Sequence, residues 1–284
     1  TDNATAANAT LVTNNTATTI FSFNATGGTS TVITNAGGAF DISGLFTNGL
    51  TVGSIAGAGS YFLGAKTLTV GSNNTDTAVD GTLADGGGSV GTGGALTKVG
   101  TGTLTLNSAN TYTGATTVSS GGLVVGDAGH AGASLAGPVT VTGGILSGHG
   151  SIGGAVSNTG GTVAPGGSIG TLTVASFAQG PGGTLSLDVN PAAASQLNVS
   201  GTAALGGRLK LNFTAGANYT PQTYVLVQSA GLSGSFDNAA LPPGALGASL
   251  DITGTEVDLV LSEPFVFVPG VAVAASPNQG SAPS

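Results

Sequence analysis

Residues 94–126 read GALTKVGTGTLTLNSANTYTGATTVSSGGLVVG, and this stretch decides the fold. Leu and Val alternate with Thr over four to six residues at a time, as in residues 102–106. Strict alternation predicts short strands with one apolar side, and the Gly, Asn and Ser clusters between them predict tight turns with positive φ. The stretch therefore predicts several short strands that follow one another closely.

The same kind of strand recurs along the chain at uneven separations. We find it at residues 50–52, 68–70, 104–106, 139–141 and 172–174, with a looser copy at 185–187. Uneven separations favour coils of unequal length over the identical blades of a propeller.

No long amphipathic helix accompanies these strands, so a conventional parallel sheet with crossover helices is not expected. A solenoid makes parallel pairs by winding the chain, with each coil about 4.8 Å from the last. We predict an all-β parallel solenoid with Leu, Val and Ile inside and rows of Thr outside. Roughly nine or ten coils would extend some 45 Å.

Composition excludes several functional classes. The chain has 40% hydrophobic but only 6% charged residues, and Thr, Ser and Asn must keep it soluble. A net charge of −8 argues against nucleic acid as a partner. With no Cys there is neither a disulfide nor a thiolate metal site. No run of eighteen apolar residues predicts a membrane-spanning helix.

The quoted stretch also resembles a known family. Residues 96–98, 102–106, 110–114 and 116–118 follow one another in an order and spacing similar to the passenger-associated repeat of bacterial autotransporters. Residues 161–174, GTVAPGGSIGTLTV, look like the start of the C-terminal passenger region called the autochaperone or junction. The resemblance covers roughly residues 49–261.

The resemblance implies a right-handed parallel β-helix of three-sided coils with a C-terminal β-sandwich-like cap, displayed outside the cell at the outer membrane. It also implies an outer-membrane β-barrel translocator in the full-length precursor, and folding that starts at the C-terminal end. Because the sequence begins at Thr1 without an apolar leader and ends without a barrel, we expect a processed product or a piece of a longer chain.

On this basis we divide the chain into four parts. They are irregular N-terminal coils (1–48), a β-helix with the repeat (49–160), an autochaperone-like junction and cap (161–263), and a Pro/Ala/Ser-rich tail (264–284).

Two short motifs suggest catalysis but lack the necessary context. Residues 148–153, GHGSIG, match a dinucleotide fingerprint, but no helix or distant carboxylate is expected to follow. Residues 166–170, GGSIG, match a nucleophile elbow around Ser168, but a strand follows where a hydrolase has a helix. His130 and His149 both precede Ser168, the reverse of the hydrolase order. We predict no catalytic and no cofactor-binding residues.

Other polar and aromatic residues are interpreted structurally. Asp76, Asp80 and Asp85 match no calcium loop, so we predict a solvated loop rather than a metal site. His130 and His149 each lie beside Gly, and we expect turn residues that face water. The aromatic residues we expect in the core or at coil corners rather than in a sugar-binding strip are Tyr61, Phe62 and Tyr112.

We therefore expect a non-enzymatic stalk and folding nucleus that carries an adhesive or effector region. The alternative is an adhesin or a self-associating fibre subunit that binds a host surface or other copies through its solenoid faces. The tail segments 265–268 and 271–273 are strand-like, so they either return onto the cap or add a strand to a neighbouring molecule.

Overall fold

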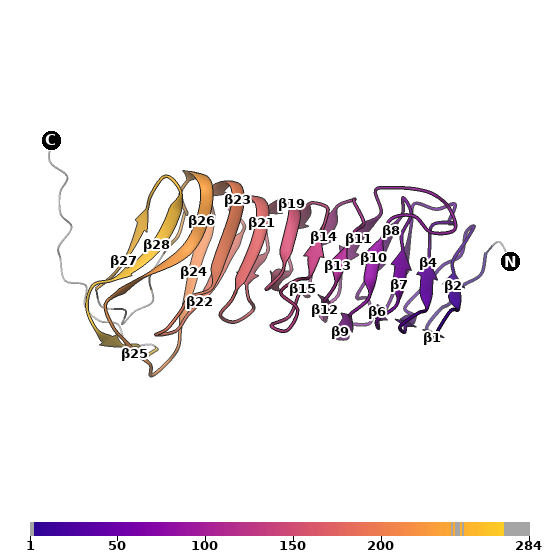
Figure 1. Ribbon diagram of the computed structural model, residues 1–284, viewed down its shortest axis with the longest axis horizontal. Coiled ribbons are helices and arrows are strands. Elements are labelled where there is room, and N and C mark those ends of the chain that lie inside the picture. Colours follow the sequence, from indigo (N-terminus) through magenta and orange to yellow (C-terminus); the bar gives the residue numbers. More distant parts are fainter. Residues whose placement is uncertain (1–2, 240, 242–244, 246, 270–284) are drawn as a thin grey trace.

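The computed structural model describes residues 3–239, 241, 245 and 247–269, and every regular element in them is a β-strand. The strands stack along one axis into an elongated β-solenoid of about nine turns, with the first strands (residues 10–20) and the last long strands (residues 248–261) at opposite ends of the stack (Figure 1). The prediction of an all-β parallel solenoid is confirmed. No helix that could span a membrane occurs among these residues.

Each coil visits three faces in the same order, and we call them face I, face II and face III. Face I consists of two sheets joined by a bridge between Gly57 and Val79. Its strands are β1 (Thr10–Thr13), β3 (Thr31–Thr34), β6 (Ser54–Ala56), β9 (Thr77–Val79), β12 (Thr103–Leu106), β15 (Gly122–Val125), β18 (Ile145–Gly148), β20 (Thr162–Pro165), β22 (Thr184–Val189) and β24 (Arg208–Phe213).

Face II begins as a four-stranded sheet and continues with two very short strands. Its strands are β2 (Thr18–Ile20), β4 (Ala39–Asp41), β7 (Ser60–Phe62), β10 (Thr82–Ala84), β13 (Ala109–Asn110) and β16 (Ser134–Leu135). Face III starts with β5 (Gly49–Val52), β8 (Thr67–Val70), β11 (Ala95–Lys98), β14 (Thr116–Val118) and β17 (Val139–Val141).

In the C-terminal coils single long strands cross from face II to face III. These strands are β19 (Ser151–Asn158), β21 (Thr171–Gln179), β23 (Gln196–Leu205) and β26 (Gln222–Gly234). The register shifts at the corner in each pairing, for example between Val174 and Phe177. A bulge bends the strand there without ending it.

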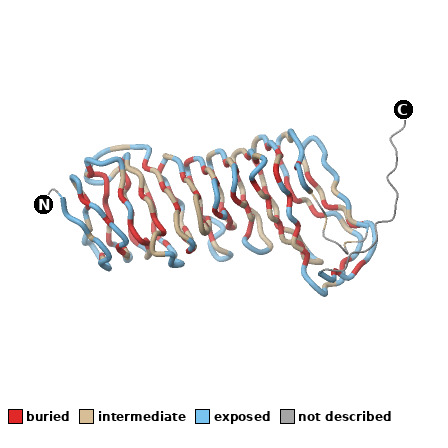
Figure 2. The backbone as a smooth tube through the Cα atoms, turned by 180° about the vertical axis from the view of Figure 1, so that it is seen from behind, coloured by how far each residue is buried: buried red, intermediate tan, exposed pale blue. Residues whose placement is uncertain are grey.

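The pairing register places like side chains in columns. On face III, Leu50, Leu68 and Leu96 lie directly above one another and are buried. Outside them runs a column of hydroxyls, formed in order by Thr51, Thr69, Thr97, Thr117, Thr140 and Ser157. Buried positions recur on every turn along the stack (Figure 2). The predicted inner aliphatic columns and outer Thr rows are confirmed.

The uneven spacing of the recurrent strands has a simple cause. Residues 50–52, 68–70 and 139–141 lie on face III, whereas residues 104–106 and 185–187 lie on face I and residues 172–174 on face II. One sequence pattern serves all three faces, because each face needs the same alternation of inward aliphatic and outward polar side chains.

The C-terminal end changes from parallel to antiparallel pairing. Strand β28 (Glu256–Leu261) pairs antiparallel with β26 and with β27 (Ala248–Ile252). Strand β29 (Phe265–Val266) pairs antiparallel with β25 (Asn218–Tyr219). The start of the tail thus returns onto its own chain, and residues 271–273 lie outside the described residues. The hand of the winding and the sandwich-like nature of the cap stay predictions.

Candidate functional site

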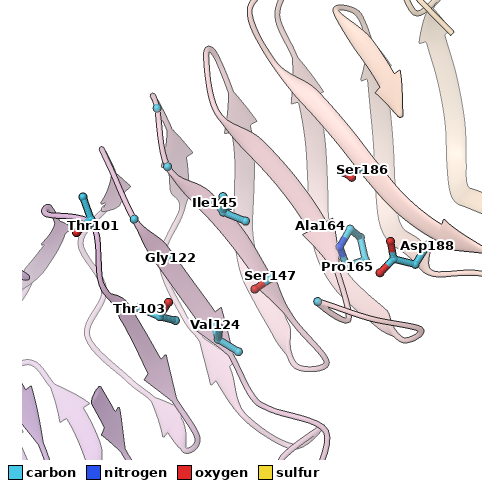
Figure 3. Close-up of a pocket in the computed structure, with 14 residues that line it drawn as sticks. Thr101, Thr103, Gly122, Val124, Ile145, Ser147, Ala164, Pro165, Ser186 and Asp188 are labelled. Atoms are coloured by element: carbon cyan, nitrogen blue, oxygen red, sulfur yellow. The ribbon is translucent and has the colours of Figure 1, made fainter. Parts of the chain in front are cut away.

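A shallow groove of about 660 Å³ follows face I across five consecutive coils. It is lined from β12, β15, β18, β20 and β22, and its labelled side chains step from one strand to the next in Figure 3. The face is hollow here because outward positions carry small residues: Gly122, Ser147 and Ala164. Face I therefore offers a channel parallel to the solenoid axis.

The groove lining is almost uncharged. Thr101, Thr103, Ser147 and Ser186 contribute hydroxyls, while Asp188 is the one ionisable residue among the lining residues. Asn212 donates from Nδ2 to Asp188 Oδ1 at 2.9 Å, which fixes the carboxylate at one end. No imidazole or amine lines the groove to act as a base or acid beside it. The arrangement can hold a neutral extended chain by hydroxyl and backbone contacts.

The dinucleotide-like motif at residues 148–153 lies in the turn between β18 and β19. A strand follows it, not a helix, so no helix N-terminus is present to hold a pyrophosphate. The elbow-like motif at residues 166–170 is a turn between β20 and β21. In that turn, the backbone carbonyl of Ser168 accepts a hydrogen bond from Ser195 Oγ at 2.7 Å.

The prediction that both His residues face water is wrong for His149. Its ring is half-buried against Gly170, where a Cβ would lie 2.5 Å from Nε2, and its buried Nδ1 has no hydrogen-bond partner in the described part of the chain. His149 thus contacts Gly170, two positions after Ser168, although no hydrogen bond joins the side chains of His149 and Ser168. His130 is exposed, as predicted, with Nδ1 2.7 Å from Asp127 Oδ1.

The three aspartates bind the next coil instead of a common centre. Asp76 accepts a hydrogen bond from the Thr103 amide at 2.7 Å, and Asp80 accepts one from Asn107 Nδ2 at 2.8 Å. Both side chains are exposed, but each links its coil to the one above. No group of three His, Asp or Glu gathers around a metal-sized space in the residues that the structure covers.

Asp85 anchors the long loop between β10 and β11. Its carboxylate accepts hydrogen bonds from the amides of Gly93 and Gly94 and from the amide and hydroxyl of Thr113. Partial burial raises the pKa of Asp85, but these hydrogen bonds, with Thr113 first, outweigh it and hold the pKa below its usual value. The ionised form is therefore favoured in the folded chain.

We expect Asp85→Ala to loosen this loop and to lower the stability of the chain by about 1 kcal/mol, because four donors lose their acceptor. In the wild-type chain this contribution is complete above the unfolded pKa of Asp, about 3.9, and is lost as the pH falls through the lowered folded pKa. Urea unfolding between pH 7 and pH 2 measures both effects. Exposed Glu263→Gln is the control, and an equal acid dependence in both variants would contradict the assignment.

Residues of the stretch 94–126 form hydrogen bonds between coils. Asn110 Oδ1 accepts from the Leu83 amide in the preceding coil, and its Nδ2 donates to the Ser134 carbonyl in the following one. Tyr112 is fully buried, its hydroxyl shares a hydrogen bond with Thr116, and burial raises its pKa. Tyr61 is buried as predicted, whereas Phe62 is half-buried.

A buried cation is the feature that the sequence analysis missed. Lys98 is 1% exposed and occupies the inward column of face III between Val70 and Val118. Its Nζ donates to the carbonyls of Val99 and Ser120, and burial lowers its pKa, an effect that Asp76 only partly opposes. The alternation Leu96-Thr97-Lys98 could have revealed it, because residues 96 and 98 point to the same side.

A family of repeats matches part of the chain. The family model described as passenger-associated-transport-repeat matches residues 96–125. These residues run from β11 to β15 and include Lys98, Asn110 and Tyr112. No curated protein matches the chain.

Proposed function

Since the passenger-associated repeat and the β-solenoid around it fit an autotransporter passenger, we propose that this chain is a rigid spacer and folding nucleus that carries an adhesive or effector region. The family points to a place outside the cell or on its surface. We propose no catalytic role, because the groove on face I contains a carboxylate without a partner acid or base among its lining residues.

The uninterrupted stack is the observation that carries the spacer role. About nine turns, at about 4.8 Å each, give a body some 45 Å long. Its buried hydrophobic residues form one cluster along the stack, so the coils resist bending relative to one another. Such a body holds whatever precedes it at a fixed distance.

Deletion of one whole coil tests this proposal. Thr116 pairs with Val139, so removal of residues 116–138 joins two coils in register. We expect a chain that folds, is about 5 Å shorter in small-angle scattering, and displays an N-terminal reporter as well as the full chain does. Removal of residues 116–127 breaks the register and is the matched control. Loss of cell-to-cell aggregation on removing residues 1–160 would instead favour the adhesin.

Strand length supports a folding nucleus at the C-terminal end. From β4 to β17 the separate strands of faces II and III in one coil have 5 to 7 residues together, whereas β19, which crosses both faces, has 8, β21 has 9, β23 has 10 and β26 has 13. Longer strands make more backbone hydrogen bonds with the next coil. The coils at this end therefore form the most backbone hydrogen bonds, and these offset the conformational entropy that is lost when the coils become ordered.

Hydrogen exchange tests the order of stability directly. We expect the amides of β21, β23 and β26 to exchange most slowly, and those of β1 to β4 to exchange fastest, with rates at least a hundredfold apart. The measurement is native-state exchange followed by mass spectrometry on the whole chain. Uniform protection, or slowest exchange in the N-terminal coils, would contradict the nucleus.

The alternative function is direct binding through a solenoid face. The groove on face I favours it, because a channel across five coils fits an extended ligand. The tail is less suited to strand addition between molecules, since Phe265 and Phe267 are buried against Phe213 of the same chain.

A further inference from the structure

Two phenylalanines stand apart from every other aromatic residue of the chain. Of the ten Phe and four Tyr, only Phe23 and Phe46 are exposed, at 44% and 71% of their surface. They lie beside each other on neighbouring coils, with ring centroids 5.1 Å apart. The other twelve aromatic residues are buried or half-buried, whereas these two rings are presented to the solvent.

The backbone holds this pair in place through a strained conformation at Phe23. Phe23 has φ of 56°, a left-handed conformation that a bulky side chain rarely adopts. The Phe23 amide donates to the Gly44 carbonyl, and the Phe46 amide donates to the Phe23 carbonyl at 2.6 Å. A strained residue persists only where the surroundings fix it, and such residues gather at functional sites.

The rings form a right-angled corner. Their planes meet at 82°, so the edge of one ring faces the other and an open ring face remains beside it. Exposed Asn24 and Asn48 follow each ring closely in sequence, and their amides make no hydrogen bond within the described part of the chain. An apolar platform therefore lies next to free donors and acceptors.

The coils that carry the pair contain few charges. Residues 3–65 contain one charged side chain, Asp41, which is buried and accepts hydrogen bonds from Ser43 and Gly88. The Gly88 contact comes from the loop between β10 and β11, which reaches back toward the N-terminal coils (Figure 1). The next charged residue in sequence is Lys66, which precedes Thr67, and the Thr67 amide donates to the Asn48 carbonyl.

We propose that Phe23 and Phe46 form a binding site for a neutral sugar. The C–H groups on one side of a pyranose ring carry partial positive charge and pack on the negative face of an aromatic ring. Asn24 and Asn48 then reach the hydroxyls at the edge of the sugar. A protein partner would need about 800 Å² on each side, far more than two rings offer. This site is independent of the spacer role, so either can fail alone.

Saturation-transfer NMR tests the site on the whole chain, with the methyl pyranosides of glucose, galactose, mannose and N-acetylglucosamine as probes. We expect transfer to the C–H protons of at least one of them, and at least a tenfold loss of affinity in Phe46→Ala. Ile145→Ala, which removes an exposed apolar side chain from face I, should bind as the wild type does.

Phe23→Gly separates a binding role from a structural one. Glycine accepts the left-handed backbone, so the variant should be as stable as the wild type in urea yet should lose the sugar. The proposal is overturned if no pyranoside contacts the chain, or if binding survives in the double variant that combines Phe23→Gly with Phe46→Ala. It is also overturned if sedimentation shows that the rings instead hold two copies together.

Discussion

Gly71→Ala is expected to lower the free energy of unfolding by about 3 kcal/mol or more, the largest effect of any single methyl group that we predict. Gly71 has φ of 114° at the corner after β8, and a Cβ there would lie 1.9 Å from the Val99 carbonyl oxygen of the next coil. This carbonyl belongs to the backbone and cannot swing aside as the end of a side chain can. The coils must separate to admit the methyl group.

The loss of stability in Gly71→Ala should be confined to the neighbouring coils as well as large. Because each coil contacts mainly its neighbours, hydrogen exchange should speed up around β5, β8 and β11 while β21 to β26 keep their protection. Gly132→Ala is the matched control, since Gly132 has no atom near its missing Cβ, and it should change stability by less than about 0.5 kcal/mol. Similar urea midpoints for the two variants would show that the corner is not so tightly packed.

Lys98→Ala is expected to cost about 3 kcal/mol, because the carbonyls of Val99, Gly100 and Ser120 lose their shared donor inside the stack. Lys98→Met keeps most of the volume and should recover part of the loss, since the same column holds Val70 and Val118. Lys66→Ala, on a half-buried lysine, is the control. A smaller loss for Lys98→Ala than for Lys66→Ala would contradict the assignment.

The lowered pKa of Lys98 gives this prediction a second measurement. In the unfolded chain the group holds its proton up to about pH 10.4, whereas the folded chain releases it earlier. Stability should therefore rise with pH between the folded and the unfolded pKa, as the sign of the linkage relation requires. Lys98→Met should lack that rise.

The sequence predicts the repeating strand well and the corners poorly. Alternation at residues 50–52 or 104–106 is a local property, so the strands and their inward faces follow from it directly. Which face a strand joins depends on turn lengths between strands, which local patterns do not specify. The strands that cross two faces, such as β21, were predicted only as far as residue 174 for the same reason.

The candidate sites show the same limit. Asp85 and Thr113 are 28 positions apart and meet only because coils stack, so an isolated reading of residues 76–85 suggested a solvated loop. Phe23 and Phe46 likewise lie on different coils, and neither was singled out by its neighbours in sequence. To predict contacts between coils one must know the pairing register of their strands, and only the structure gives that register.

Because the column of hydroxyls on face III is uncharged, we expect the chain to tolerate solutions of very different salt content. The one ion pair found in the described residues, His130 with Asp127, is half exposed, and the strands are held mainly by aliphatic packing and by hydrogen bonds at contact distance. Dissolved salt screens charges over about 10 Å at 0.1 M but leaves such contacts almost untouched. The stack should therefore keep the same shape and the same melting temperature in fresh water, in serum and in brine.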